Sequence, residues 1–197
     1  STPIKSSAAS DVYKRQADNG AGYLMPGMLQ EPRSVSGLKS GLSAWAKHCS
    51  KYYQKWGLTI TGFVIDGEAP GLDSDGLDCY ASFSPNGIVP QKMPLTLLHN
   101  DMPVIRADYD IVDHDYRRAT DVIVERVEKR PVPFHWFRAI LKSPSWYKGI
   151  CDELKQRHTN IELLDAPTFF ELYRIYLKQH PDAAAGKITM NLSLIHI

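Results

Sequence analysis

The sequence predicts an α/β protein with a mainly parallel sheet and flanking helices, built either as a partial (β/α) barrel or as a small open sheet. Three observations lead to this fold class. Short apolar runs rich in β-branched residues alternate with helical apolar stripes, and the connections between them are short, which is typical of right-handed βαβ units. Only four or five strands are predicted, whereas a complete eightfold barrel takes about 250 residues.

The first half of the chain shows this alternation most clearly. Apolar residues recur every three or four positions over residues 38–56, which predicts an amphipathic helix that ends at Gly57. Residues 58–65 are apolar and β-branched, so they predict a buried strand that leads into an acidic loop. A loop is predicted at residues 17–32, because glycines and prolines occur there without periodicity.

The remaining predicted elements continue the alternation. Helices are predicted at 75–84, 119–127, 146–154 and 168–180, and strands at 88–89, 102–107, 132–137 and 160–164. Residues 84–100 carry three prolines and are predicted to be irregular apart from the short strand. Strands and helices of these lengths are consistent with one α/β layer structure.

Composition and charge exclude several classes of partner. The 197 residues are 43% hydrophobic and 23% charged, which suffices for one sizeable core. The 23 basic and 22 acidic residues give a net charge of +1 and form no basic stripe, so we expect no nucleic-acid partner. No stretch reaches the roughly 18 apolar residues of a membrane helix, so we expect no membrane partner. Cys49, Cys79 and Cys151 lack disulfide or zinc spacing; we expect three buried thiols, no metal and no cofactor.

Both ends of the chain differ from the rest. Residues 1–16 lack the apolar segment of a signal peptide, and together with residues 191–197 they look like translated sequencing-adapter sequence found on metagenomic reading frames. We therefore expect both ends to be non-native and unpacked, and residues 17–190 to form a single α/β domain. This domain is expected to be a fragment of a longer parent protein whose chain continues on both sides.

Residues 20–26, Gly20-Ala-Gly22-Tyr23-Leu-Met-Pro26, form the most distinctive string in the chain. A dinucleotide-binding fingerprint is excluded, because that motif leaves a strand and opens a helix, whereas here Ala-Asp-Asn precedes the string and Pro26 closes it. Two glycines indicate either a backbone with positive φ or the close approach of another group. The string is therefore either a structural turn or part of a binding site.

This string resembles the signature of the GxGYxYP family of glycoside hydrolases, with Gly20, Gly22, Tyr23 and Pro26 in register and Met25 in place of the second tyrosine. Segments 63–68, 80–89, 101–109 and 165–174 are similar to the same family, so the resemblance covers nearly all of residues 19–180. It implies the C-terminal part of a carbohydrate-processing protein that is exported to the periplasm or the cell exterior. It also implies that the N-terminal region of the parent protein is absent here and is a partner of this domain.

Two pairs of acidic residues follow predicted strands: Asp66 with Glu68, and Asp108 with Asp110. In parallel α/β folds the site lies at the carboxyl ends of the strands. A glycosidase needs one protonated and one ionised carboxyl group, so we expect Asp66, Glu68 and Asp108 to be catalytic and Asp110 to bind the carbohydrate substrate. We expect Asp66 and Asp108 to face a common cleft, with the 20–26 loop at the same end of the sheet. The alternative is that these aspartates cap helices or lie solvated in loops.

Three further residues are predicted to contact the substrate, together with Gly20, Gly22 and Tyr23 of the string. Arg106 lies in a predicted strand and points to a carboxylate, or else forms a buried ion pair. His135 and Trp136 end another predicted strand, where imidazole can serve as an acid or base and indole as a flat platform for a sugar ring. Core packing is the commoner role of tryptophan. The segment 99–101 ranks behind these residues, because it precedes a strand.

Three functions remain open from the sequence. The first is a glycoside hydrolase that uses carboxylate acid–base chemistry, and the second is a non-catalytic carbohydrate-binding or interaction domain. The third is a metal-assisted hydrolase with Asp66, Asp108 and His135 as ligands. Geometry separates them: an apposed carboxyl pair favours the first, acids spread apart favour the second, and a facial cluster that includes His135 favours the third.

Overall fold

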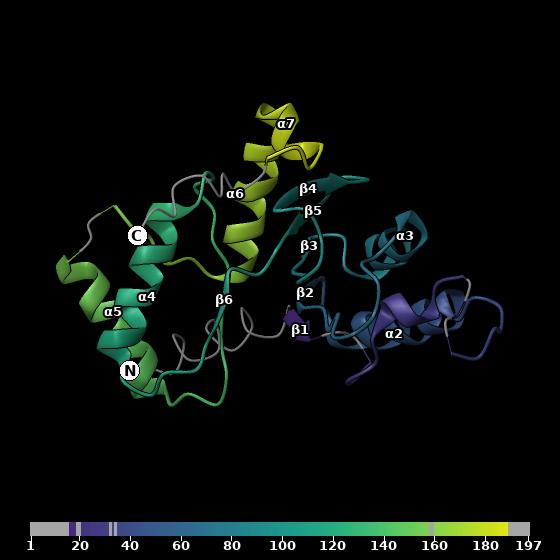
Figure 1. Ribbon diagram of the computed structural model, residues 1–197, viewed down its shortest axis with the longest axis horizontal. Helices are drawn as coiled ribbons and strands as arrows, with labels where there is room; N and C mark the ends of the chain where they lie inside the picture. The colour runs from purple at the N-terminus through teal and green to yellow at the C-terminus, as the bar shows by residue number, and fades with distance from the viewer. Residues whose placement is uncertain (1–15, 19–20, 32, 34, 158–159, 189–197) are drawn as a thin grey trace, which may run out of the picture. The chain divides into compact units, whose positions relative to one another are not determined.

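The computed structural model describes residues 16–18, 21–31, 33, 35–157 and 160–188 of the 197-residue chain (Figure 1). Contacts divide the chain into two compact units. Among the described residues, the first comprises 16–106 and 165–188, and the second comprises 107–164. A separate sheet lies in each unit. The expectation of a single domain over residues 17–190 stays a prediction.

The first unit is built on an open five-stranded sheet with the strand order β1-β2-β3-β5-β4. The parallel strands are β1 (Gln16–Asp18), β2 (Ile60–Phe63), β3 (Gly87–Ile88) and β5 (Met102–Ile105), and β4 (Thr96–His99) runs antiparallel to β5 at one edge. The predicted fold class is thereby confirmed. In the described part of the chain the strands form a small, mostly parallel open sheet with flanking helices and no closed barrel.

Helices α2 (Leu42–Trp56) and α3 (Ser74–Phe83) pack on one face of this sheet. Of the apolar positions that recur every three or four residues in α2, Leu42, Trp45 and Cys49 are buried in the helix–sheet core, whereas Tyr52 and Trp56 are exposed. The Trp45 ring meets Tyr80 of α3 edge-on at 4.9 Å between centroids. Gly57 ends α2 as predicted, with a φ of 66° that a residue with a Cβ rarely adopts. The helix begins four residues later than predicted, after the loop that precedes Leu42.

Helix α6 (Ala166–Gln179) covers the opposite face of the sheet. Successive strand residues point to opposite faces. Ile88 lies in the α2–α3 core, whereas a Cβ on the neighbouring Gly87 would lie 2.2 Å from Cδ1 of Phe170 in α6. The first unit therefore has three layers, and the short helix α7 (Pro181–Ala184) follows α6 beside β4.

The second unit combines the short parallel strands β6 (Tyr109–Ile111) and β7 (Phe137–Ala139) with helices α4 (Tyr116–Lys129) and α5 (Pro144–Arg157). Apolar side chains from β6 and both helices form its core. The buried members are Ile111, Ala119, Ile123, Val124, Trp146, Ile150 and Leu154. The predicted helices at 119–127 and 146–154 are confirmed, and each extends a few residues beyond its apolar stripe at both ends.

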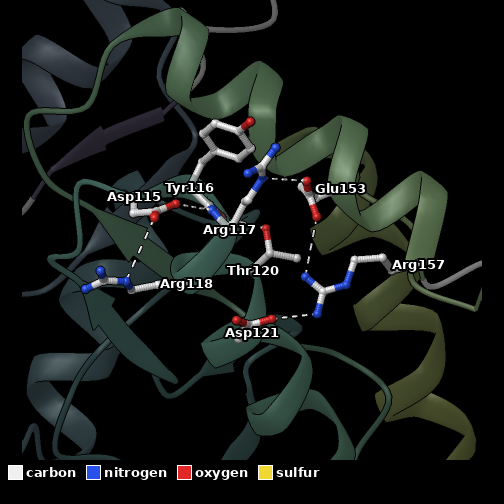
Figure 2. A network of polar contacts seen from close by, with 8 residues as sticks. All are labelled: Asp115, Tyr116, Arg117, Arg118, Thr120, Asp121, Glu153 and Arg157. Carbon is white, nitrogen blue, oxygen red and sulfur yellow. Dashed lines mark hydrogen bonds and ion pairs between the residues drawn. The ribbon is translucent and has the colours of Figure 1, made fainter.

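Polar contacts join the solvent-facing sides of α4 and α5, as Figure 2 shows. Glu153 of α5 accepts hydrogen bonds from Arg117 Nε at 3.3 Å and from Arg157 Nη1 at 3.4 Å. Arg157 also donates to Asp121 of α4 at 2.5 Å, and Asp115 caps α4 by accepting from the backbone N–H of Arg117 at 2.8 Å. Most of these side chains are exposed, so the network contributes little to the stability of the fold.

Two predicted strands are not formed. Residues 132–136 of the strand predicted at 132–137 are irregular, because Pro131 and Pro133 have no N–H to contribute to a ladder, and β7 begins only after them. Residues 160–164 are also not a strand. Asp165, predicted to end that strand, instead caps α6 by accepting a backbone N–H at 2.9 Å. Both predictions were wrong, since a short apolar run cannot reveal whether a neighbouring strand is available to pair with it.

The described residues include only a small part of the two ends that we expect to be non-native. Residues 1–15 and 189–197 lie outside the described residues, so the unpacked, non-native ends stay a prediction. Gln16 is the last residue of the segment 1–16 that we expect to be non-native. It is also the first residue of β1, which pairs with β2. Within the part of the chain that is described, no helix combines the length and the apolar character needed to cross a membrane.

The three cysteines do not share one environment. Cys49 of α2 is buried as predicted, and burial, with a smaller effect from the neighbouring Cys79, raises the pKa of its thiol to about 12. Such a thiol stays protonated at neutral pH and packs as a small apolar group. Cys79 and Cys151 are half-buried, so the prediction of complete burial was wrong for them.

Candidate functional site

Three loops leave the carboxyl end of the sheet in the first unit. The motif loop, residues 21–30, follows β1 and includes the 3-10 helix η1 (Pro26–Leu29); the acidic loop, residues 64–73, follows β2; and residues 89–95 follow β3. Because these strands are parallel, the loops emerge at the same end of the sheet. This is the end where binding sites of parallel α/β folds lie.

The motif loop packs closely on the acidic loop, and two glycines make the contact possible. Met25 Sδ lies 2.6 Å from the point that a Cβ on Gly67 would occupy, and a Cβ on Gly27 would lie 2.1 Å from the carbonyl oxygen of Pro70. A larger residue at Gly27 would clash with the Pro70 backbone unless the loops separated, whereas at Gly67 the Met25 side chain would have to move and the φ of 47° also favours glycine. Met25, which stands where the resembled signature has a tyrosine, thus fills the space beside the acidic loop.

Gly22 serves the turn of the motif loop. Its φ is 62°, and nothing lies within 4 Å of the position of its missing Cβ, so conformation rather than close approach requires glycine there. The turn presents Tyr23 with 90% of its surface exposed, and Gly20 lies outside the described residues. The contact between the loops confirms that this loop lies at the Asp66 end of the sheet. Its position relative to Asp108 stays a prediction, because Asp108 belongs to the second unit.

Asp66 anchors the acidic loop to the loop after β3. The residue is 2% exposed, and its Oδ2 accepts hydrogen bonds from the backbone N–H groups of Gln91 at 2.6 Å and Lys92 at 2.7 Å. Lys92 Nζ returns a hydrogen bond to the Ala69 carbonyl at 2.9 Å. Burial raises the pKa of Asp66, and the two amide hydrogen bonds oppose that shift. Glu68, two residues further on, is exposed, so the acidic loop holds one enclosed and one accessible carboxyl group.

Gln30 joins the motif loop to the end of the acidic loop, and no sequence pattern indicates this role. Its side chain is 8% exposed; Oε1 accepts from Asp73 N at 2.8 Å and Nε2 donates to Gly71 O at 3.2 Å. A glutamine at the end of a loop is usually solvated. Only the folded structure shows that the Gln30 side chain forms hydrogen bonds with two backbone groups. Gln30, Asp66 and Lys92 together connect the three loops through side-chain hydrogen bonds.

Two other predicted positions lie in the first unit. Arg106 follows β5 at the carboxyl end of the sheet; it is half-buried, and its backbone N–H donates to Leu95 O at 3.1 Å. His99 lies at the turn between β4 and β5, at the opposite end of the sheet, where it forms a 2.7 Å contact with Asp78 of α3. The segment 99–101, which we ranked below the other candidates for substrate contact, therefore lies at the amino end of β5 as expected.

Asp108 lies in a buried cluster of the second unit, three residues after the end of β5 and one residue before β6. Its catalytic role stays a prediction. Its carboxylate forms an ion pair with Arg130, and the two side chains are 4% and 3% exposed. Oδ2 also accepts the backbone N–H of Trp136 at 2.9 Å, and His135 Nδ1 lies 3.6 Å from Oδ1. His135 and Trp136 likewise precede β7 instead of ending a strand. Asp108 thus links the segment before β6 to the segment before β7.

Asp110 is paired as well. It stands opposite Arg138 in the register of β6 and β7, and the two side chains form a two-pronged ion pair in which Arg138 Nε donates to Oδ1 at 2.7 Å. Both are about one-third exposed, at 33% and 28%. Trp136 is half-buried. Asp108, predicted to be catalytic, and Asp110, predicted to bind substrate, are therefore both paired with arginines, an arrangement that we considered from the sequence only for Arg106.

The predicted site residues thus fall into two groups. The motif loop, Asp66 and Glu68 come together in the first unit, and Asp108, His135 and Trp136 come together in the second. The common cleft of Asp66 and Asp108 stays a prediction, because the two belong to different units. Among the described residues, no three His, Cys, Asp or Glu side chains are grouped so as to hold a metal ion, which leaves the metal-assisted alternative without a ligand set there.

Comparison with known proteins does not assign the chain to a family. No protein-family model matches it, and the comparisons with curated proteins and with solved structures find no match. The resemblance to the GxGYxYP glycoside hydrolases therefore remains an expectation from the sequence.

Proposed function

We propose that the carboxyl end of the sheet in the first unit binds carbohydrate, with Tyr23 and Glu68 as the contacting side chains. The observation that carries the proposal is the contact of the motif loop with the acidic loop, which places a 90% exposed tyrosine and an exposed carboxylate on two adjoining loops. An exposed aromatic ring offers the apolar face on which a sugar ring stacks, and its hydroxyl remains available to the solvent side. A carboxylate accepts hydrogen bonds from sugar hydroxyl groups.

The way the loops are held supports this proposal. Asp66 and Gln30 bind backbone groups of the neighbouring loops, so the loops that carry Tyr23 and Glu68 are fixed before any ligand arrives. Binding to a preformed surface loses less free energy, because the loops do not have to be ordered when the ligand binds. Within this proposal Asp66 positions the site, and Glu68 contacts the ligand.

Hydrolysis of a glycosidic bond is the second candidate, and one observation favours it. Burial raises the pKa of Asp66, while Glu68 in the same loop is exposed. A glycosidase needs one carboxyl group that keeps its proton and one that is ionised. In this scheme Glu68 acts as base or nucleophile and Asp66 as the acid. The Asp108 pair with Arg130 fits a structural role better than a catalytic one.

Binding is tested by measuring the affinity of the full chain for a panel of neutral and acidic glycans. We expect Tyr23→Ala to weaken the best ligand roughly tenfold or more, as loss of a central aromatic contact does. Tyr147→Ala is the matched control, because Tyr147 is 46% exposed but lies on α5 of the second unit. Equal affinities for the wild type, Tyr23→Ala and Tyr147→Ala would refute the proposed site.

Hydrolysis is tested in the full chain with the ligands found by the panel. If the two acids are catalytic, Asp66→Asn and Glu68→Gln each lower turnover by about 10²–10⁴-fold without abolishing binding. A loss of less than about tenfold in both variants leaves carbohydrate binding standing and removes the catalytic assignment.

A further inference from the structure

The helix layer of α2 and α3 has a basic half and an acidic half. Helix α2 contains no acidic residue and carries exposed lysines at 47, 51 and 55 together with His48. Helix α3 with its cap contains no lysine or arginine and carries exposed aspartates at 73, 75 and 78. The chain as a whole is nearly neutral, so this separation of charge is a local feature of one face of the first unit.

The two charged regions lie at opposite ends of the layer. Both helices run from the carboxyl end of the sheet towards its amino end, because each leads into one of the parallel strands β2 and β3. Lys51 and Lys55 lie in the last two turns of α2, whereas Asp73 and Asp75 lie at the start of α3. Asp78 lies in the middle of α3 and contacts His99 at the amino end of the sheet. Lys51 and Lys55 therefore lie towards the amino end of the strands, and Asp73 and Asp75 lie towards their carboxyl end.

Aromatic rings accompany the lysines. Tyr52 and Trp56 are 39% and 61% exposed, and with His48 they follow one another at four-residue spacing along one side of α2. His48 and Tyr52 have ring centroids 4.9 Å apart, and Lys55 Nζ lies 5.2 Å from the Trp56 ring centroid. Exposed Tyr and Trp residues are enriched in protein–protein interfaces, where they supply most of the binding free energy.

We propose that this face of α2 and α3 docks a second copy of the same chain in a two-fold symmetric dimer. A two-fold axis that lies in the interface, perpendicular to the line joining the basic and acidic ends, places each end on the opposite end of the partner. The basic residues of each copy then contact the acidic residues of the other copy, so the same contact occurs twice, as an isologous interface requires. Tyr52 and Trp56 are covered in the contact. The proposal does not depend on the carbohydrate site, which lies on the loops at the carboxyl end of the sheet.

Charge complementarity selects a second copy over an anionic polymer or an anionic membrane. A polyanion on the lysines of α2 also meets the three aspartates of the adjoining α3, whose like charge repels it. A copy of this chain presents the opposite sign to both halves. The contact is therefore expected to weaken as salt is added, because exposed charges are screened over about 10 Å at 0.1 M ionic strength.

The test is sedimentation equilibrium of the full chain over a range of protein and salt concentrations, with charge-reversed variants. Lys51→Glu/Lys55→Glu reverses the basic half. Asp75→Lys changes the acidic half; it is preferred because Asp73 caps α3 and Asp78 contacts His99. Lys39→Glu/Lys155→Glu is the control of equal charge change: both residues are exposed, Lys39 lies before α2, and Lys155 lies on α5 of the second unit.

We expect a monomer–dimer equilibrium for the wild type and for the control, and a dissociation constant raised roughly tenfold or more in each reversed variant. Mixing Lys51→Glu/Lys55→Glu with Asp75→Lys should recover part of the lost association, since the heterodimer keeps one unaltered contact between a basic and an acidic half and pairs the introduced glutamates with the introduced lysine; a variant that failed to fold would not do so. A wild type that remains monomeric at millimolar concentration overturns the proposal. So does a dimer that the reversed variants and the control weaken equally.

Discussion

Replacing Asp66 tests how the carboxyl end of the sheet is held together. In the wild type its 2% exposed carboxylate accepts backbone hydrogen bonds from Gln91 and Lys92 at 2.6 and 2.7 Å. Asp66→Ala removes the acceptor for both donors, and a hydrogen bond to a charged group contributes about 1.5–3 kcal/mol. Gln91 and Lys92 are exposed, so water replaces part of the loss. We expect the free energy of unfolding to fall by about 2–4 kcal/mol.

Urea unfolding followed by circular dichroism measures this loss in the full chain. Asp66→Asn keeps one oxygen as a neutral acceptor, so it should cost about 1 kcal/mol. Glu68→Ala is the control, because Glu68 is exposed in the same loop and should change stability by no more than about 0.5 kcal/mol. A cost of Asp66→Ala no larger than that of Glu68→Ala would refute the reasoning that Asp66 anchors the loops.

The pH dependence of the Asp66→Asn effect tests the balance between burial and hydrogen bonding. Burial raises the pKa of Asp66 above the usual 3.8, against the two amide hydrogen bonds. A raised pKa means that the folded protein keeps this proton to higher pH than the unfolded chain. The stabilisation is then present in full below pH 3.8 and lost as the pH rises through the folded-state pKa. The stability difference between wild type and Asp66→Asn should therefore shrink from acid to neutral pH; a difference that grows instead shows that hydrogen bonding dominates.

Three further substitutions probe other parts of the fold, each by urea unfolding. Arg130→Met leaves the 4% exposed Asp108 carboxylate without its cation and should cost about 3–5 kcal/mol; a smaller loss than 1 kcal/mol would mean that the pair is not buried in solution. Gly87→Ala would place a Cβ 2.2 Å from Phe170 at a φ of 149° and should cost at least about 1–3 kcal/mol; wild-type stability would contradict the packing of α6 on β3. Glu153→Gln, which weakens the network of Figure 2, should lower stability slightly at low salt and not at high salt; a salt-independent loss would contradict an exposed ionic network.

The elements that were predicted correctly are those whose apolar pattern repeats over many consecutive residues. Helix α2 repeats its apolar positions over four turns and stops at a glycine, so nothing outside the segment was needed to find it. The strand β4 was missed, because it lies in a proline-rich segment and exists only through pairing with β5. Short strands carry too few residues for a pattern, and their partners decide whether they form.

The candidate site was predictable in its composition and not in the state of its acids. The motif string and the Asp66 loop were recognised from residue types, and the fold places them in contact. Whether a carboxylate after a strand faces a ligand or binds the backbone depends on which N–H groups lie within reach. For Asp66 these groups come from Gln91 and Lys92, about 25 residues away in the chain, and Asp108 likewise finds its cation in Arg130.

By itself the sequence determined the fold class, the position of most helices, the buried strand that leads to Asp66 and the glycine-rich turn that exposes Tyr23. These features follow from periodicity and from backbone conformations that glycine permits, which are properties of neighbouring residues. Only the tertiary structure decided that the described residues form separate apolar cores in the two units and that Gln30 and Asp66 bind adjoining loops. Those outcomes depend on contacts between segments far apart in the chain, which no local pattern encodes.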